Sequence, residues 1–168
     1  MKKNVLITGG TGFVGKHLTD LLIESGFSVS ILSRNKKQNI SDIFYYTWDV
    51  EKQEIENEAV LNADFIIHLA GENIAAKRWS KKRKEEIVKS REESIQLIHS
   101  VLKKNRKVPE AFISASAVGI YGAINGETVC TEETPVAADF LGSTCYKWKL
   151  LWIVLVAWGF VPLQLERV

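Results

Sequence analysis

The sequence predicts an α/β fold in which helices cover a doubly wound parallel sheet. Three observations favour this fold: short β-branched runs alternate with helical patterns, glycines follow the first run directly, and the chain has the length of one domain. Its 168 residues are 46% hydrophobic, which is enough to bury a single core. Strands that are joined by helices through right-handed crossovers form a parallel sheet. We therefore predict one domain over residues 1–168.

The expected strands are short runs rich in β-branched and aromatic residues. They lie at residues 3–8, 27–33, 44–48, 64–69 and 111–114, with a last strand within 161–168. Because helical patterns separate most of these runs, we expect the strands to be parallel.

The expected helices lie at residues 12–25, around 55–61, in the long segment before Pro109, and at about 139–158. In the long helix, four apolar residues are spaced to share one face, namely Ile87, Ile95, Ile98 and Leu102. Residues 115–136 contain three glycines and a proline and are expected to form a long loop. Loops of this length in compact domains are usually functional.

Glycines at positions 9, 10, 12 and 15 follow the first strand and open the first helix. Side chains are excluded at such positions where a strand turns sharply into a helix whose N-terminal N–H groups meet a pyrophosphate. The order of strand, glycine turn and helix predicts a dinucleotide-binding turn of the Rossmann type, although an ordinary glycine-rich turn is the alternative. The expected cofactor contacts in this turn are Gly9, Thr11, Gly12, Phe13, Val14 and Gly15.

The end of the second strand predicts which dinucleotide is preferred. A site for NAD places a carboxylate there, about 20 residues past the glycines, whereas a site for NADP places a cation. This chain has Ser33 and Arg34 at that point and no carboxylate. Their hydroxyl and guanidinium groups are suited to a 2′-phosphate, so we expect NADP, with NAD possible. The alternative is a solvated basic turn, since exposed cations are common after strands.

Composition argues against several other functions. A net charge of +2 is too small to favour nucleic acid or an anionic membrane as the main partner, and the cationic run at 81–84 lacks aromatic stacking residues. Cys130 and Cys145 are too few for a disulfide framework, and no histidine has a second ligand at metal spacing, so we expect no metal and a reducing cytoplasm. The apolar segment 150–161 is shorter than the roughly 20 residues that span a bilayer and predicts a buried helix.

Several motifs resemble a known family. They are Thr8-Gly-Gly-Thr-Gly-Phe-Val-Gly15, Trp48-Asp49, His68-Leu-Ala-Gly71 and Ser114-Ala-Ser-Ala-Val-Gly-Ile-Tyr-Gly122. With these motifs the chain resembles the extended short-chain dehydrogenase/reductases. The further motifs Gly71-Glu-Asn-Ile74, Arg78-Trp79, Ser90-Arg91, Asp139-Phe-Leu141 and Cys145-x-x-Trp148 make it similar to the atypical, epimerase-like branch of the NAD-dependent epimerase/dehydratase family.

The resemblance implies roles for individual residues. It implies that Asp49 lies near the adenine, although a cap at the end of the strand is an equal alternative for this side chain. It also implies that the cofactor is lined by Leu69, Ala70, Gly71 and Ser114. Ser116 corresponds to the hydroxyl that hydrogen-bonds a substrate carbonyl or alcohol near the nicotinamide. The alternative for Ser116 is a hydroxyl that satisfies the loop backbone.

The expected proton-transfer pair departs from the superfamily pattern. The usual pair is Tyr-x-x-x-Lys, in which residues four apart share a helix face and the ammonium lowers the pKa of the phenol. Here Cys145 stands at the tyrosine position, with Lys149 four residues on, while Tyr146 is turned about 100° away on the helix. A cysteine near a lysine can exchange a proton, but a small buried core residue is an equal interpretation of Cys145.

Two classes of function follow from these residues. The first is an NADP-dependent oxidoreductase or epimerase that exchanges hydride with a hydroxyl- or carbonyl-bearing small molecule. The second is a non-catalytic dinucleotide-binding sensor or interaction module. The resemblance also implies that a C-terminal substrate subdomain of the family is absent from this chain. Apolar side chains in the last helix could then support a homodimer, namely Leu151, Trp152, Leu155 and Trp158.

Overall fold

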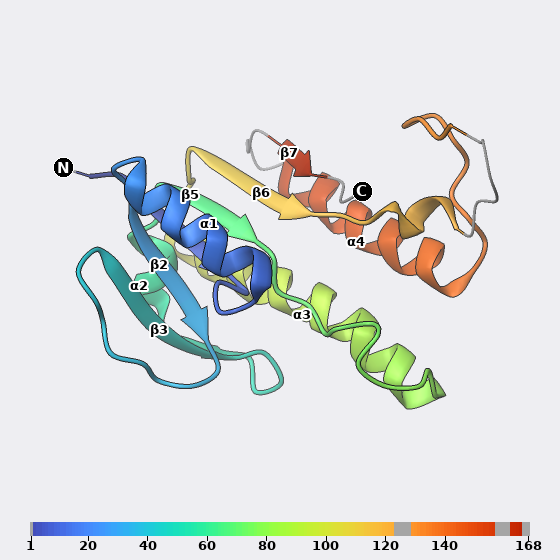
Figure 1. Cartoon of the computed structure of the whole chain (residues 1–168), viewed down its shortest axis with the longest axis horizontal. Helices are drawn as coiled ribbons and strands as arrows, with labels where there is room; N and C mark the ends of the chain where they lie inside the picture. Colours follow the sequence, from blue (N-terminus) through green and yellow to red (C-terminus); the bar gives the residue numbers. More distant parts are fainter. Residues whose placement is uncertain (1, 123–128, 157–161, 166–168) are drawn as a thin grey trace.

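The computed structural model describes residues 2–122, 129–156 and 162–165, with side chains described up to Leu151. Its centre is a seven-stranded sheet of order β4-β3-β2-β1-β5-β6-β7 (Figure 1). The strands are β1 (Asn4–Thr8), β2 (Ser28–Ser33), β3 (Ile43–Asp49), β4 (Glu54–Ile55), β5 (Phe65–His68), β6 (Ala111–Ala115) and β7 (Pro162–Leu165). All neighbouring strands are parallel except β3 and β4, which are antiparallel. The prediction of a doubly wound parallel α/β sheet is confirmed.

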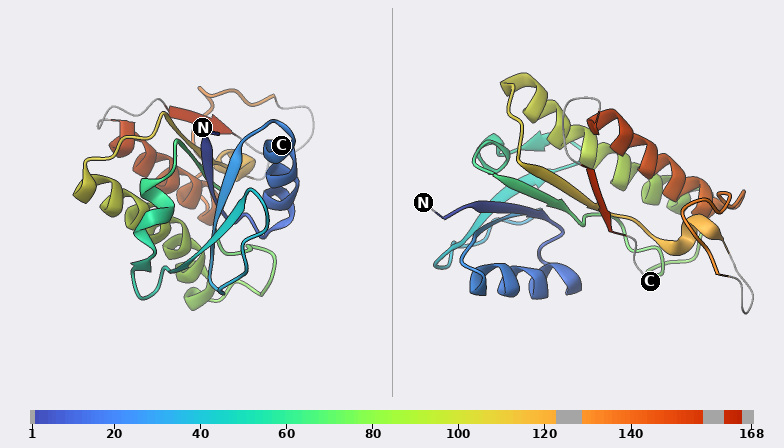
Figure 2. Two further views of the ribbon diagram at one scale, coloured as in Figure 1. Left: turned by 90° about the vertical axis from the view of Figure 1, so that its left-hand side faces the viewer. Right: turned by 90° about the horizontal axis from the view of Figure 1, so that it is seen from above.

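Helices lie on both faces of this sheet. They are α1 (Phe13–Glu24), α2 (Asn57–Leu61), α3 (Lys81–Asn105) and α4 (Phe140–Val156), with a short 3-10 helix η1 (Val118–Tyr121). Among them, α1 covers one face, whereas α3 and α4 lie on the other (Figure 2). None of the helices in the described ranges is long and apolar enough to cross a membrane.

The alternation of side chains along β1 supplies both halves of the core. Val5 and Ile7 point into a cluster with Leu18 of α1, whereas Leu6 between them belongs to the cluster under α3. This period of two is the expected pattern for a strand that is buried on both faces. The predicted apolar face of α3 is confirmed, because Ile87, Ile95, Ile98 and Leu102 are all buried.

Two elements were not predicted from local patterns. Strand β4 returns beside the end of β3, with Trp48 paired to Ile55, and the following helix begins only at Asn57. The turn between β3 and β4 is stabilised by the Asp49 carboxylate, which accepts from the N–H of Lys52 at 3.1 Å. The second element, η1, lies at the start of the predicted loop and packs against α4.

The end of the chain agrees with the expectations as far as it is described. Strand β7 falls within the predicted segment 161–168, of which residues 161 and 166–168 lie outside the described residues. The predicted last helix is α4, and residues 157–158 of that prediction also lie outside them. The side chains of Trp152, Leu155 and Trp158 are not described, so the homodimer stays a prediction.

Candidate functional site

The candidate site lies where the strand order reverses. Strand β1 is flanked by β2 on one side and β5 on the other, so the chain winds away from it in both directions. The loops that follow these strands separate at this point, and ligands of open α/β sheets bind in the resulting crevice at the carboxyl ends of the strands. The predicted glycine turn follows β1 directly and therefore lies at this point.

The glycine turn is built by close backbone packing. The N–H of Gly12 donates to the carbonyl of Gly9 at 2.9 Å, and Gly9 has a φ of +71°, which favours glycine. A Cβ atom on Gly9 would lie 3.0 Å from the backbone N of Ala70, and one on Gly15 would overlap the Gly9 carbonyl oxygen. The turn thus packs against both the loop after β5 and the first turn of α1 without room for side chains.

The N-terminus of α1 is open at its first turn. Gly12 is the N-cap residue and no side chain caps the helix, nor does an acidic residue occur in the first turn. Thr11, Gly12 and Phe13 are exposed, whereas Val14 is half-buried and Gly15 is buried. The first N–H groups of a helix attract anions through their partial positive charge. This end of α1 is therefore suited to a phosphate group.

A buried polar network connects β1, β5 and α3 beneath the crevice. The Thr8 hydroxyl oxygen accepts from the N–H groups of Leu69 and Ala70, each at 3.1 Å, and lies 2.8 Å from Nδ1 of His68. On the other side of the ring, Nε2 of His68 lies 3.2 Å from the Ser94 hydroxyl oxygen. Because the Thr8 oxygen already accepts two bonds, its proton points to Nδ1, and the neutral ring carries its own proton on Nε2.

Burial keeps His68 neutral. The side chain is fully buried, and desolvation, followed by the nearby charge of Arg91, lowers its pKa from 6.5 to about 3. A neutral ring is required by the hydrogen-bond pattern, since a protonated Nδ1 could no longer accept from Thr8. The Ser94 hydroxyl in turn donates to the Arg91 carbonyl at 3.1 Å, which completes the network.

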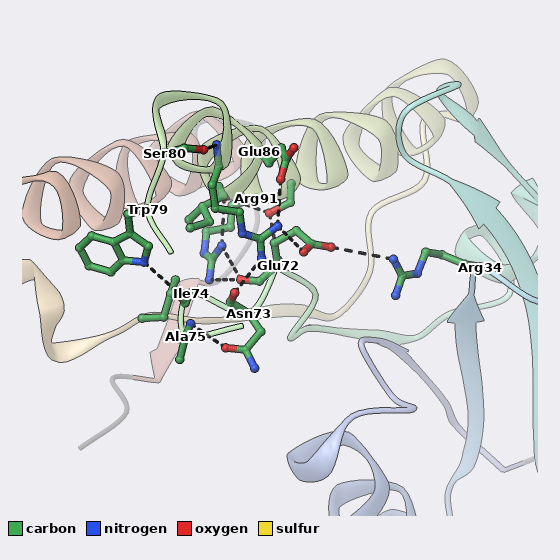
Figure 3. Close-up of polar contacts among 12 residues, drawn as sticks. Arg34, Glu72, Asn73, Ile74, Ala75, Trp79, Ser80, Glu86 and Arg91 are labelled. Carbon is green, nitrogen blue, oxygen red and sulfur yellow. Dashed lines mark hydrogen bonds and ion pairs between the residues drawn. The ribbon is translucent and has the colours of Figure 1, made fainter. Parts of the chain in front are cut away.

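The loop after β5 is fixed by side chains of α3 (Figure 3). Arg83, which is buried, donates to the Glu72 carboxylate at 2.9 Å and to the Asn73 carbonyl at 2.8 Å. The Ser90 hydroxyl accepts from the N–H of Glu72 at 3.0 Å, and both terminal nitrogens of Arg91 lie 3.2 Å from the Glu72 carbonyl oxygen. The loop that borders the crevice is therefore held in place on its far side.

Gly71 packs directly on the Arg91 guanidinium, because a Cβ atom there would lie 3.1 Å from the Arg91 Cζ atom. Arg91 also lies over the ring of Trp148 on α4, 5.3 Å from its centroid. The sequence motifs Gly71-Glu-Asn-Ile74 and Ser90-Arg91 thus meet in space. Trp79 joins the same region, since its Nε1 donates to the Ile74 carbonyl at 2.7 Å and its ring meets Phe140 edge-on.

At the end of β2, Ser33 is buried and Arg34 extends into solvent with 84% of its side chain exposed. Arg34 and Asp49 help to line an open hollow at the carboxyl ends of β2 and β3. The Asp49 carboxylate accepts from the Lys52 N–H, which lowers the pKa of Asp49. Asp49 therefore caps the end of its strand, as one of its two expected roles requires, and a contact with adenine stays a prediction.

The residues expected for catalysis come from the segment after β6 and from α4, and Ser114, which is expected to line the cofactor, lies in β6 itself. Ser114 is buried and donates to the Ala115 carbonyl at 3.1 Å. Ser116 follows the strand and is buried. Cys145 is buried on α4, where a Cβ atom on Gly119 of η1 would lie 3.8 Å from its sulfur. Lys149 is half-buried one turn further along α4.

Several residues of the site were not expected from the sequence. Thr8, His68 and Ser94 lie on three separate elements, and each of them fits its local pattern as an ordinary strand or helix residue. Glu72 belongs to a motif that carried no assigned role for it, and Arg83 belongs to the cationic run at 81–84. In the described part of the chain, no group of three acidic, histidine or cysteine side chains could hold a metal ion.

Comparison with known proteins identifies the relatives of the chain. A sequence model of the NAD dependent epimerase/dehydratase family matches residues 5–149. The epimerase family protein YfhF of Bacillus subtilis is 37% identical over 147 residues, which cover 87% of this chain and 48% of that protein. The chain therefore spans about half the length of the curated relatives it matches.

Solved structures share the fold. A nucleoside-diphosphate sugar epimerase from Corynebacterium glutamicum has a TM-score of 0.78 and 29% identity, over 99% of this chain and 34% of that one. The human epimerase family protein SDR39U1 (isoform 2), solved with NADPH, has a TM-score of 0.66 and 26% identity, over 88% of this chain and 48% of that one.

The buried neutral His68 predicts a stability that falls with acid. The unfolded histidine takes up a proton near pH 6.5, whereas the folded one resists it until about pH 3. The contribution of His68 is therefore complete above pH 6.5 and is lost as the pH falls toward 3, by up to about 1.4 kcal/mol per pH unit. Urea unfolding between pH 7.5 and 4.5 measures this slope.

His68→Gln keeps an acceptor and a donor without a titrating ring, so its slope should be smaller than that of the wild type. His17→Gln carries the same change at an exposed histidine and serves as the control. An unchanged slope in His68→Gln would show that other groups cause the acid sensitivity.

Proposed function

The chain belongs to the NAD dependent epimerase/dehydratase family, and from this premise we propose that it binds NADP at the carboxyl end of β1 and serves an oxidoreductase or epimerase reaction. The observation that carries the proposal is the glycine turn at the strand-order reversal, which faces the open N-terminus of α1. These residues fit a pyrophosphate because backbone N–H groups are free of a side-chain cap and the turn has no side chains in the way.

The preference for NADP rather than NAD rests on Arg34 and Ser33. Ser33 ends β2 and Arg34 follows it, at the position where an NAD site has a carboxylate. The guanidinium is always charged and can form two parallel hydrogen bonds to a phosphate. The human relative, 26% identical, was solved with NADPH. The remaining walls of the proposed site are Leu69, Ala70 and Gly71 after β5 and Ser114 at the end of β6.

We propose that the substrate is a small molecule with a hydroxyl or carbonyl group. A bound nicotinamide would supply or accept the hydride. The Ser116 hydroxyl would donate a hydrogen bond to the substrate oxygen, which polarises a carbonyl. Cys145 would exchange the proton with the same oxygen, and Lys149 would favour its thiolate form.

The second candidate is a dinucleotide-binding protein that does not turn over a substrate. The observation that favours it is the environment of Cys145, which is only 6% exposed and lies against η1. A small buried thiol in this setting is also an ordinary core residue. In that case the glycine turn would bind the cofactor for sensing or for assembly with a partner.

Gly12→Val tests cofactor binding. Gly12 has φ −78° and ψ 178°, which any residue adopts, and the only described atom near an added Cβ is the Gly9 carbonyl oxygen at 3.2 Å. The variant should therefore fold but lose NADPH binding, because its side chain occupies the approach of the pyrophosphate. Isothermal titration measures the affinity, and circular dichroism checks the fold. If a folded Gly12→Val protein binds NADPH with wild-type affinity, the proposed pyrophosphate site is wrong.

Arg34→Ala tests the choice between the two cofactors. The loss of a charged hydrogen bond should weaken NADPH by about 1.5–3 kcal/mol and leave NADH nearly unchanged. Lys36→Ala removes a neighbouring exposed cation and is the matched control. Equal losses of NADPH and NADH affinity in Arg34→Ala would contradict the assignment of Arg34 to the 2′-phosphate.

Cys145→Ala tests the proton transfer. If Cys145 exchanges the proton, turnover should fall by roughly 10²–10⁴ with cofactor affinity retained, since acid and base catalysis acts mainly in the transition state. The assay follows NADPH oxidation by a form of the protein that turns over a carbonyl compound. Cys145→Ser, which keeps the size of the side chain, controls for packing. A wild-type rate in Cys145→Ala would leave Cys145 as core packing, and Ser116 or Tyr121 would be tested next.

A further inference from the structure

We propose that Glu72 limits the preference for NADP over NAD by competing with the 2′-phosphate for Arg34. The inference rests on the proposed function, because it takes Arg34 as the phosphate-binding cation. It adds a second specificity-determining residue, which lies on a different loop and carries the opposite charge.

The ion pair between Arg34 and Glu72 crosses the crevice. Arg34 follows β2 and Glu72 belongs to the loop after β5, while β1 and its glycine turn lie between these strands in the sheet. A terminal nitrogen of Arg34 lies 3.9 Å from the Glu72 carboxylate, and Figure 3 shows the guanidinium pointing toward it. Within the described residues, Glu72 is the acidic group that lies within ion-pair distance of Arg34.

The two partners are held very differently. Glu72 is bound through its carboxylate to Arg83 at 2.9 Å, and its backbone is bound by Ser90 and Arg91. Its side chain is 39% exposed, against 84% for Arg34. The Glu72 charge is thus a fixed part of the crevice wall, whereas the Arg34 side chain is free to exchange one anion for another.

This arrangement acts on the two cofactors in opposite ways. The 2′-phosphate of NADP must separate Arg34 from Glu72, and it brings a second negative charge close to a fixed carboxylate. The 2′-hydroxyl of NAD carries no charge and meets no repulsion. Glu72 therefore weakens NADP binding selectively, and the effect decreases as salt screens the charges.

Glu72→Gln tests the proposal, and Glu86→Gln is its matched control. Both carboxylates contact the same nitrogen of Arg83, Glu72 at 2.9 Å and Glu86 at 3.0 Å, with 39% and 40% of their side chains exposed. A glutamine oxygen still accepts from Arg83, so both variants should fold, which urea unfolding checks. Only Glu72 also faces Arg34.

Fluorescence titrations with NADPH and NADH give the expected result. Glu72→Gln should bind NADPH about two- to fivefold more tightly, the range of an exposed ion pair, with NADH affinity unchanged. Glu86→Gln should leave the ratio of the two affinities at the wild-type value. In an Arg34→Ala background, Glu72→Gln should lose the part of its effect that comes from competition for Arg34, and only the direct repulsion between Glu72 and the phosphate should remain.

The failure of the inference differs from the failure of the proposed function. If Arg34→Ala selectively weakens NADPH but Glu72→Gln leaves the ratio unchanged or lowers it, the role of Glu72 is overturned. The same holds if Glu86→Gln produces an equal shift. If neither cofactor binds the wild type, or Arg34→Ala weakens both equally, the NADP site itself is wrong and the role of Glu72 falls with it.

Discussion

The crevice depends on the close approach of two loop backbones at the carboxyl ends of β1 and β5. Gly9 makes this approach possible, because a Cβ atom there would lie 3.0 Å from the backbone of Ala70. The Thr8 hydroxyl holds the approach in place by accepting the N–H groups of Leu69 and Ala70. Without this hydroxyl the N–H of Ala70 would need another partner at a half-buried position, whereas the N–H of Leu69 also donates to the Thr8 carbonyl at 3.1 Å. The wall of the crevice and the glycine turn are therefore one unit, and His68 orients the hydroxyl that joins them.

Helix α3 supports this unit from outside the sheet. Its Arg83 and Arg91 both bind the loop after β5, one through the Glu72 carboxylate and the other through the Glu72 carbonyl. Burial lowers the pKa of Arg91, while electrostatic interactions with Cys145 and Glu72 raise it. Since Arg91 also covers the Trp148 ring, the same side chain connects the loop after β5 with α4.

The parts of the fold that local pattern determines could be predicted from the sequence. The glycine turn and the buried face of α3 are encoded by residues a few positions apart. The buried face of α3 is confirmed, and the order of strand, glycine turn and helix is observed, whereas dinucleotide binding by the turn stays a prediction. The contact between His68 and Thr8 could not be predicted, because its partners are 60 residues apart and each fits an ordinary strand. The burial of Arg83, within the cationic run at 81–84, could not be predicted, because it depends on where the loop after β5 returns. Strand β4 was missed because two residues give no periodicity.

The two halves of the proposed site differ in how well they tolerate amino-acid substitutions. The proposed cofactor half is made largely of backbone, so it tolerates few side chains and is recognisable in the sequence. The proposed proton-transfer half depends on single side chains of α4, where Cys145 lies against η1. A thiol there lies within the electrostatic reach of Arg91, and a neighbouring cation favours the thiolate. Proton transfer by Cys145 stays a proposal, and the charge of Arg91 is the feature of its surroundings that supports it.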